Sequence, residues 1–293
     1  MNSFDIDDDL VRTLVREQHP DLADLDLRAV DGGWDNQMWR LGDELAVRMP
    51  RTPHAPTLLR AEHRWMPELA PRLSLPVPVP VRVGEPSARF PRPWTIATWV
   101  PGEPADRTPV TRGPHAADAL AGFLRRLHRE APADAPVKAD RGGPLDAVRQ
   151  AVDDMFRSVD GVDDEVRDVW EDALAAPVWQ GPPRWIHSDL HPANVVVADG
   201  TLVGVVDFGD LCAGDPATDL AAAWVLLPEG AASRFLDGYA YADEAMVRRA
   251  RGWAVLRGMM LLSVGRAGDQ GLPGGKVTWG PAGRAALDRV LAW

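Results

Sequence analysis

The chain has 293 residues, of which 45% are hydrophobic and 26% charged, as in an ordinary globular protein of one or two domains. Its formal net charge of -11 argues against a nucleic acid partner, because binding to a phosphate backbone depends on clustered Lys and Arg. The acidic start lacks the features of a signal peptide and no apolar run is long enough to span a bilayer, so we expect a cytoplasmic protein without a membrane partner.

The first 50 residues predict a helix followed by three short strands. Apolar residues at helical spacing indicate a helix over residues 4–18. Residues 25–50 then alternate as strands do, with a glycine turn in GGWDN and a hairpin turn at Gly42-Asp43. Glycines let a backbone approach anionic oxygens closely and leave its amides free to donate to them. The first turn therefore supplies four candidate nucleotide-binding residues, although a hairpin without a ligand is the alternative: Gly32, Gly33, Trp34 and Asn36.

Arg48, in the third strand (LAVRMP), is the candidate for holding phosphate oxygens, because a guanidinium stays charged and binds phosphate through two nitrogens. The helix predicted over residues 58–69 offers Glu62 as an internal ion-pair partner. The alternatives are that Arg48 lies at the surface end of a strand and that Glu62 lies on a solvated helix face.

Two further extended runs, residues 73–86 and 93–104, complete a small sheet. The second run leads into PGEP, where we expect the chain to pass from a first lobe, residues 1–100, to a second, residues 101–293. The backbone at this crossing would bond the edge of an adenine ring, and its candidate residues are Thr98, Trp99 and Val100. The rings of Trp94 and Trp99 are better suited to a core than to stacking on a base.

The remaining two thirds of the chain read mainly as helices. The apolar pattern predicts them at residues 116–128, 145–157, 162–174, 231–241, 243–263 and 281–293, with one more after Pro216. Residues 131–144 read as a mobile loop, and the glycine-rich residues 265–280 as a loop that could wall an acceptor site.

Residues 140–172 carry eleven acidic against four basic side chains. They form either the solvated outer faces of two helices or an electrostatic funnel for a polycationic substrate. The apolar residues on the opposite faces favour the first interpretation.

The most informative motif is HSDLHPANVVV, which begins at His187 and is followed by VVDFGD from Val205. Each motif is flanked by an apolar strand-like run, and a turn at Asp199-Gly200 joins them as a hairpin. The alternative is two unrelated tight turns that match by chance. The order and the flanking strands argue against it.

These residues suit the transfer of a phosphoryl group. That reaction needs a carboxylate to orient the attacking hydroxyl and accept its proton, and oxygen ligands to hold Mg²⁺ against a triphosphate. Asp189 suits the first role, and Asn194 with Asp207 suits the second, since Mg²⁺ prefers carboxylate and amide oxygens.

Two residues beyond this motif also have candidate roles. Asp219 lies in the first turn of a predicted helix, where its carboxylate would either brace the backbone of the loop around Asp189 or cap its own helix. Cys212 is the only cysteine, so there can be no internal disulfide, and we expect it to be a packing residue.

Together these motifs resemble the aminoglycoside phosphotransferase family, the small-molecule branch of the protein-kinase-like fold. The likeness rests, in chain order, on GGWDNQMW, LAVRMP, the helix with Glu62, ALAGFLRRLH, HSDLHPANVVV, VVDFGD and GDPATDLA. It implies an α+β fold of two lobes, with a small antiparallel sheet in the N-terminal lobe and a larger, mostly helical C-terminal lobe.

The resemblance also implies site roles. Asp189 would be the catalytic base in a loop with His187, Asn194 and Asp207 the Mg²⁺ ligands, Arg48 and Glu62 a phosphate-orienting pair, and Asp219 a support of the loop. His191 stands where protein kinases usually carry Lys, and no APE-type motif follows Asp207, so peptide docking is not expected.

The implied activity is transfer of a phosphoryl group from ATP or GTP to a hydroxyl of a small cationic molecule, with an aminoglycoside-type antibiotic as the first expectation. A macrolide, a peptide antibiotic or an amino-alcohol metabolite is the alternative acceptor. A nucleotide-binding protein without catalysis is the alternative of another class. The sequence gives no sign of an obligate protein partner.

Overall fold

The computed structural model describes residues 6–293, which divide into two compact units. The first unit comprises residues 6–72, Pro76–Pro101 and Val206–Gly209. The second comprises Leu73–Leu75, Gly102–Val205 and Asp210–Trp293. Residues 206–209 therefore belong to the first unit, although they come late in the chain.

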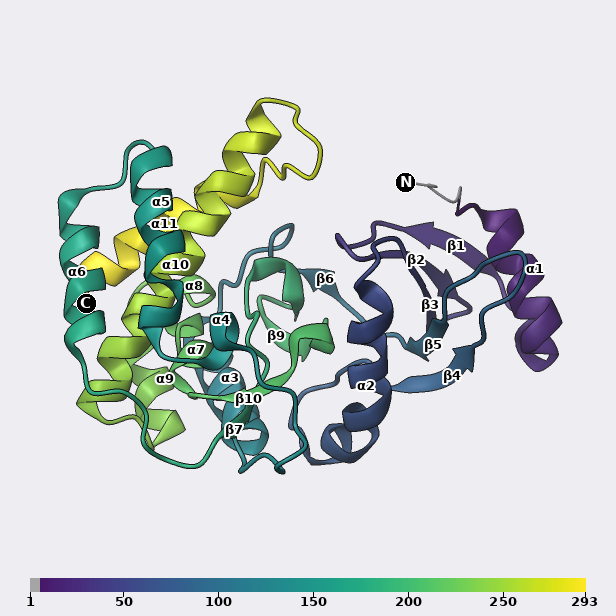
Figure 1. Ribbon diagram of the computed structural model, residues 1–293, viewed down its shortest axis with the longest axis horizontal. Coiled ribbons are helices and arrows are strands. Elements are labelled where there is room, and N and C mark those ends of the chain that lie inside the picture. Colours follow the sequence, from purple (N-terminus) through teal and green to yellow (C-terminus); the bar gives the residue numbers. More distant parts are fainter. Residues whose placement is uncertain (1–5) are drawn as a thin grey trace. The chain divides into compact units, whose positions relative to one another are not determined.

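The first unit is an antiparallel sheet with the strand order β1-β2-β3-β5-β4 and two long helices (Figure 1). Its strands are β1 (Leu27–Val30), β2 (Asn36–Leu41), β3 (Leu45–Pro50), β4 (Pro80–Gly84) and β5 (Trp94–Thr98). Its helices are α1 (Asp8–Gln18) and α2 (Ala55–Leu69). The five predicted strands are thus confirmed, and each is shorter than its apolar run. The predicted start of the first helix, at residue 4, lies outside the described residues.

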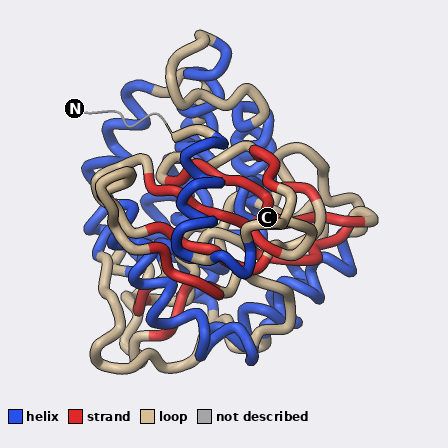
Figure 2. The backbone as a smooth tube through the Cα atoms, turned by 90° about the vertical axis from the view of Figure 1, so that its right-hand side faces the viewer, coloured by secondary structure: helices blue, strands red, loops and turns tan. Residues whose placement is uncertain are grey.

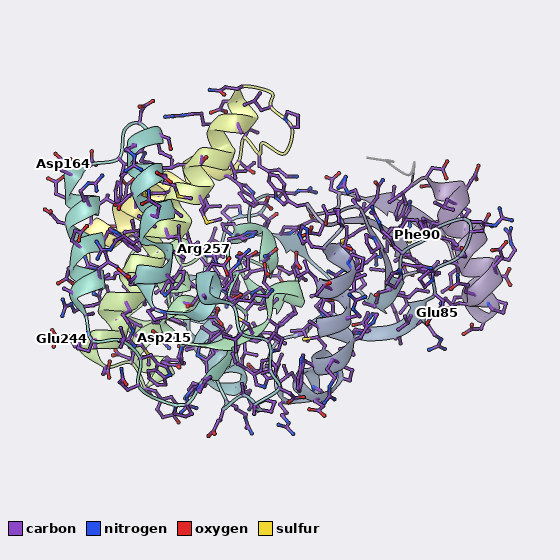
Figure 3. The ribbon with its side chains drawn as sticks, viewed as in Figure 1. Glu85, Phe90, Asp164, Asp215, Glu244 and Arg257 are labelled. Atoms are coloured by element: carbon purple, nitrogen blue, oxygen red, sulfur yellow. The ribbon has the colours of Figure 1, made fainter. Side chains whose placement is uncertain are left out.

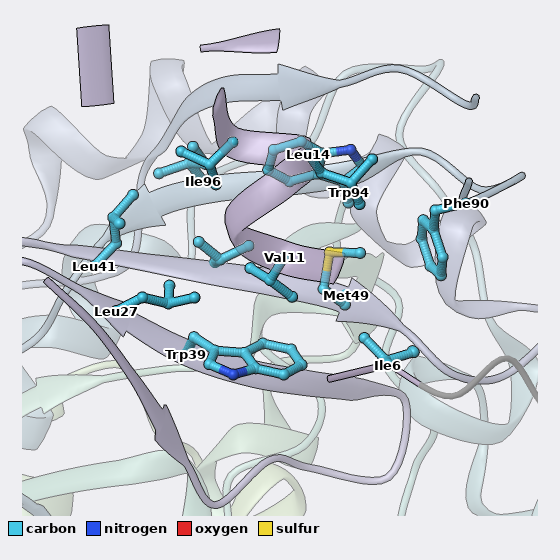
Figure 4. Close-up of a cluster of buried hydrophobic side chains, with 12 residues drawn as sticks. Ile6, Val11, Leu14, Leu27, Trp39, Leu41, Met49, Phe90, Trp94 and Ile96 are labelled. Atoms are coloured by element: carbon cyan, nitrogen blue, oxygen red, sulfur yellow. The ribbon is translucent and has the colours of Figure 1, made fainter. Parts of the chain in front are cut away.

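Helix α1 packs on the sheet through one apolar face. Asp7 caps the helix, since its Oδ1 accepts from the backbone N–H of Leu10 at 2.9 Å. One turn later the spacing of Val11, Leu14 and Val15 places all three on the buried side. Figure 4 shows Val11 and Leu14 in a cluster with Trp39 and Trp94, which also takes in Ile6, Val15, Leu27, Leu41, Val47, Met49, Phe90 and Ile96. Trp94 is therefore a core residue, as the sequence predicts.

Two small sheets lie in the second unit. One has the order β6-β8-β9, from β6 (Glu103–Pro104), β8 (Val195–Ala198) and β9 (Thr201–Val205). The turn between β8 and β9 has positive φ at both central residues, 50° at Asp199 and 75° at Gly200, as an Asp-Gly hairpin turn requires. The predicted hairpin is confirmed. The other sheet pairs β7 (Arg184–Ile186) with β10 (Cys212–Gly214), two strands of three residues that we did not predict.

Helices make up most of the regular structure of the second unit. Figure 2 colours the helices of the molecule blue. They are α3 (Gly113–Leu127), α4 (Ala139–Gly142), α5 (Arg149–Ser158), α6 (Asp164–Ala175), α7 (Ala217–Leu220), α8 (Ala222–Val225), α9 (Ala232–Tyr239), α10 (Glu244–Asp269) and α11 (Trp279–Leu291). The long helix α10 packs against α6, α7 and α11 (Figure 1). No helix within residues 6–293 combines the length and the apolar character that crossing a membrane requires.

The glycine-rich stretch 265–280 differs from its predicted form. Helix α10 continues through Gly265. This glycine allows the backbone of α10 to contact that of α11, since a Cβ built on Gly265 would lie 2.2 Å from the backbone nitrogen of Gly280. A second pair, Gly258 and Gly283, is also close, with a Cβ on Gly283 2.6 Å from the carbonyl oxygen of Gly258. Residues 265–269 and 279–280 of the predicted loop are therefore helical, whereas residues 270–278 form a loop as predicted.

The structure bears on two other expectations for this unit. The stretch 131–144 is not wholly a loop, since α4 forms within it. In the acidic helices α5 and α6, Asp153 pairs with Arg167 and Asp172 with Arg248, while Val152 and Trp170 are buried. Local pairing with arginines on one face and burial of the other is the arrangement of an outer helix face.

Candidate functional site

The loop between β7 and β8 holds Asp189 on a constrained backbone. Ser188, just before it, has a left-handed conformation with φ 67°, which costs a non-glycine residue about 1–3 kcal/mol and persists only where its surroundings fix it. Three contacts fix the conformation of Ser188. The N–H of Ser188 donates to Oδ1 of Asp219 at 2.7 Å, its hydroxyl donates to the carbonyl of Asp210 at 2.8 Å, and its carbonyl accepts from Nη2 of Arg257.

Asp219 supports the backbone of the loop that carries Asp189. Its Oδ2 accepts from the backbone N–H of His187 at 2.7 Å and lies 3.1 Å from Nε2 of His128. The side chain is fully buried, and α7 has no side-chain cap, so local capping, the alternative reading, was wrong. The other ring nitrogen of His128, Nδ1, forms a hydrogen bond with the hydroxyl of Tyr239 at 2.9 Å. No local sequence pattern links these buried polar groups, which lie far apart in the chain.

The carboxylate of Asp189 has two unequal oxygens. Oδ1 accepts from Arg141 at 2.6 Å and lies 3.0 Å from Arg257, whereas Oδ2 has longer contacts, 3.3 Å from Nδ2 of Asn194 and 3.5 Å from Nε2 of His191. Burial alone would raise the pKa of Asp189, but Arg257, His191 and Arg141 together hold that pKa well below its usual range. Asp189 is therefore ionised at neutral pH.

Two predicted residues flank Asp189 in the loop. His187 is fully buried, and its ring Nδ1 accepts from the N–H of Asp189 at 3.3 Å, so it supports the loop from inside. Asn194 donates its amide N–H to the carbonyl of Asp189 at 3.0 Å. That contact orients the amide nitrogen toward Asp189 and directs the amide oxygen elsewhere.

Trp279, which sequence reasoning missed, packs beside the loop. Its ring lies 4.8 Å from the ring of His191, between centroids, and its Nε1 donates to Oδ2 of Asp106 at 3.1 Å. Trp279 is 88 residues beyond His191 and begins α11, so no local pattern links the two. Its position fixes one side of the His191 ring.

In the first unit, Arg48 and Glu62 form a buried ion pair. Nη1 of Arg48 donates to Oε2 of Glu62, and the two side chains are only 7% and 3% exposed, so the surface alternatives for both were wrong. Nη2 of Arg48 lies 3.7 Å from Oδ1 of Asp207. Burial would lower the pKa of Arg48, but Glu62 and Asp207 outweigh it and raise that pKa, so the guanidinium stays charged.

Asp207 is well placed to bind a ligand. Its side chain is 50% exposed and its backbone has φ 63°, a left-handed conformation next to Phe208 and Gly209. Its carboxylate and the amide oxygen of Asn194 are hard oxygen donors of the kind that Mg²⁺ prefers. Within residues 6–293 no three His, Cys, Asp or Glu side chains group as metal ligands.

The glycine turn is tightly folded. A Cβ on Gly32 would lie 2.4 Å from the carbonyl oxygen of Asn36, so only glycine fits there, whereas Gly33 faces open space. The carbonyl of Gly33 accepts from Nη2 of Arg51 at 2.9 Å. Trp34 is 56% exposed, and Oδ1 of the buried Asn36 has no hydrogen-bond partner among the described residues.

The crossing stretch at the end of β5 is partly committed to the sheet. The N–H of Thr98 donates to the carbonyl of Val79 at 2.9 Å, and that of Trp99 to the carbonyl of Glu44 at 2.7 Å. The ring of Trp99 is half-buried, with the Arg40 guanidinium 5.3 Å from its centroid. The N–H groups of Thr98 and Trp99 are thus taken up within the sheet unit, and the contact of Thr98, Trp99 and Val100 with an adenine edge stays a prediction.

Cys212 lies buried in β10, and burial raises the pKa of its thiol to about 11. At that pKa the thiol is protonated at neutral pH. Cys212 is thus a packing residue, as predicted.

A sheet unit with a buried Arg-Glu pair, followed by a helical unit that presents an ionised aspartate on a braced loop, is typical of the kinase-like fold. Residues 26–258 match the model of the phosphotransferase enzyme family, so the chain belongs to that family.

Individual curated proteins with similar sequences are also kinases or phosphotransferases. An aminoglycoside 3'-phosphotransferase of Escherichia coli is 29% identical over 145 residues, 46% of this chain and 53% of the relative. A homoserine kinase of Acidiphilium cryptum is 33% identical over 169 residues, 53% of this chain and 50% of the relative. The chain thus spans about half the length of these curated relatives.

Among solved structures, the GDP complex of aminoglycoside 2'-phosphotransferase-IIIa has a TM-score of 0.67 and 21% identity. The likeness covers 96% of this chain and 97% of that one. It supports the predicted fold class, a small antiparallel sheet followed by a mostly helical part.

Proposed function

We propose that this protein is a small-molecule kinase that transfers the γ-phosphoryl group of ATP or GTP to a hydroxyl group. The observation that carries the proposal is the environment of Asp189. Its carboxylate is ionised and held on a loop that Asp219 braces, as a group that orients a nucleophile must be.

In this mechanism Asp189 accepts a hydrogen bond from the acceptor hydroxyl and aligns its oxygen with the γ-phosphorus. A new P–O bond forms to that oxygen as the bond to the bridging oxygen of the nucleotide breaks, and the hydroxyl proton passes to Asp189. His187 and Asp219 keep the loop in place.

The first 100 residues are assigned to the nucleotide. The charged guanidinium of Arg48, held by Glu62, is the proposed phosphate ligand, and the amides of the glycine turn around Gly33 are proposed to donate to phosphate oxygens. Mg²⁺, when bound, would neutralise charge on the β- and γ-oxygens, and its proposed ligands are Asn194 and Asp207. Since the proposed phosphoryl donor is ATP or GTP, we propose that the protein acts in the cytoplasm.

An aminoglycoside-type antibiotic is the first acceptor that we propose, and the similarity to the Escherichia coli aminoglycoside 3'-phosphotransferase supports it. A formal net charge of -11 is compatible with a cationic acceptor. The similarity to a homoserine kinase favours a second candidate, a small amino alcohol. Macrolides and peptide antibiotics complete the range of acceptors.

The test is to incubate the protein with Mg²⁺ and ATP or GTP against aminoglycosides, macrolides, peptide antibiotics and amino alcohols, and to detect products by mass spectrometry. Asp189→Asn serves as the inactive variant, and Asp154→Asn, which changes a 60% exposed carboxylate on α5, as its matched control. We expect the mass of one acceptor class to rise by about 80 Da, the mass of one phosphoryl group, when the parent or the control variant is used. Asp189→Asn should give no such product. Nucleotide binding without a product for any acceptor would instead support a non-catalytic protein.

A further inference from the structure

A buried arginine from α10 reaches the loop that carries Asp189. Arg257, labelled in Figure 3, is 6% exposed, and its two terminal nitrogens divide their contacts. Nη1 lies 3.0 Å from Oδ1 of Asp189, and Nη2 donates to the carbonyl of Ser188. One guanidinium thus holds both the side chain of Asp189 and the strained residue before it.

A second arginine binds the same carboxylate oxygen from α4. Nη1 of Arg141 donates to Oδ1 of Asp189 at 2.6 Å, and its Nη2 lies 2.9 Å from Oδ2 of Asp210. Asp210 is itself held by Lys138, whose ammonium donates to Oδ1 at 2.5 Å. Both guanidinia therefore meet at one oxygen of Asp189, while the other oxygen has the longer contacts with Asn194 and His191.

Stability alone does not account for this arrangement. Desolvating a guanidinium is costly, and a buried ion pair is often no more stabilising than apolar side chains of the same volume. The end of an aspartate side chain, in contrast, has a broad and nearly two-fold torsion, so its two oxygens exchange unless something outside the residue fixes them. Two guanidinia on one oxygen supply that constraint.

We propose that Arg257 and Arg141 are positioning residues that hold Asp189 by Oδ1, so that Oδ2 is the oxygen that receives the acceptor hydroxyl. This inference rests on the proposed phosphotransferase function. It assigns the two arginines a role in the rate of transfer and none in binding the nucleotide or the acceptor.

The first test replaces Arg257 by Met and compares it with Arg251→Met, the same change on the same helix. Arg251 donates to the carbonyl of Val290 and makes no contact with the loop. We expect Arg257→Met to lower kcat by about 10- to 100-fold with KM for both substrates unchanged, since small misplacements of a reacting group cost about that much. Arg251→Met should keep the parent kcat. Equal kcat values for the two variants, both confirmed as folded by circular dichroism, would overturn the proposal.

The second test uses Arg141, which is 24% exposed and so open to a small cation from solution. We expect Arg141→Ala to lower kcat and millimolar methylguanidinium to restore part of it, because the free cation can occupy the vacated position. Methylguanidinium should not raise the activity of Asp189→Asn. A rise in KM for the acceptor with an unchanged kcat would instead assign Arg141 to acceptor binding and overturn its positioning role.

A crystal structure of Arg257→Met supplies a readout that does not depend on turnover. We expect α10 to be unchanged and the carboxylate of Asp189 to be rotated or to occupy two orientations. An unaltered carboxylate would overturn the proposal even if no acceptor were found. A parent protein that transfers no phosphoryl group contradicts the proposed function, whereas an active parent with a fully active Arg257→Met contradicts this inference alone.

Discussion

Asp219 and Ser188 are 31 residues apart in the chain, yet the carboxylate of Asp219 accepts the backbone N–H of Ser188 at 2.7 Å. The same carboxylate accepts the N–H of His187. Two successive buried amides thus depend on one side chain for their hydrogen bonds. The backbone that presents Asp189 is therefore determined by a residue at the start of α7.

We expect Asp219→Ala to lower both stability and turnover. Each of the two buried N–H groups left unsatisfied costs about 1–3 kcal/mol, so the free energy of unfolding should fall by about 2–6 kcal/mol. Urea denaturation measures this change. The matched control is Asp243→Ala, which removes the cap that Asp243 provides to α10 and should cost about 1 kcal/mol with turnover unchanged. Equal effects of the two variants on kcat would argue against a role for Asp219 in the loop.

Arg48→Met should weaken nucleotide binding. A hydrogen bond to a charged group contributes about 1.5–3 kcal/mol, so the Kd for ATP or GTP measured by calorimetry should rise by about 10- to 100-fold. The Kd of Arg48→Lys should lie between those of the parent and Arg48→Met, because an ammonium keeps the charge but loses the two-nitrogen geometry. As a control, Arg28→Met removes a 53% exposed arginine from β1 and should leave Kd unchanged. A parent-like Kd in Arg48→Met would remove Arg48 from the phosphate site.

His63 should make the first unit less stable as the pH falls. Burial, and then the charge of Arg48, lower the pKa of His63, whose Nε2 lies 2.6 Å from Oγ1 of Thr95. The unfolded chain therefore binds a proton at a higher pH, near 6.5, than the folded protein does. Stability from the neutral ring is present above that pH and is lost as the pH falls through it. Chemical denaturation between pH 8 and 5 should give a flatter profile for His63→Gln, and identical profiles would refute the effect.

The glycine contact between α10 and α11 gives a packing prediction. Gly265→Ala should destabilise the protein by about 1–3 kcal/mol, because its Cβ has no room beside Gly280. Gly122→Ala is the control, since Gly122 also lies in a helix but its Cβ would meet only the hydroxyl of Ser74 at 3.7 Å. That change should be neutral or stabilising by about 1 kcal/mol through helix propensity. Thermal unfolding of both variants distinguishes the two sites, and a stabilised Gly265→Ala would contradict the close contact.

Local patterns explain which parts of this fold could be predicted. The Asp199-Gly200 turn between two valine-rich runs specifies its hairpin, and the spacing of Val11, Leu14 and Val15 specifies the buried face of α1. Each of these two signals is contained within a few neighbouring residues of the chain.

The parts that could not be predicted depend on distant partners. Helix α10 passes through Gly265 because another glycine, Gly280, allows the approach, and no helix propensity reports that. Arg141 lies 48 residues from Asp189, and Arg257 lies 69 residues from Ser188. A single arginine on a helix has no pattern that separates it from a surface charge, so this part of the site emerges only from the folded chain.

The most direct test of the central claim is the rate of phosphoryl transfer by Asp189→Asn under single-turnover conditions, with nucleotide affinity measured on the same sample. Asparagine has the same shape but cannot accept the hydroxyl proton. We predict a rate lower by about 10²-fold or more with an unchanged Kd for the nucleotide. A rate equal to that of the parent would contradict the account, because the carboxylate of Asp189 would then have no part in the transfer.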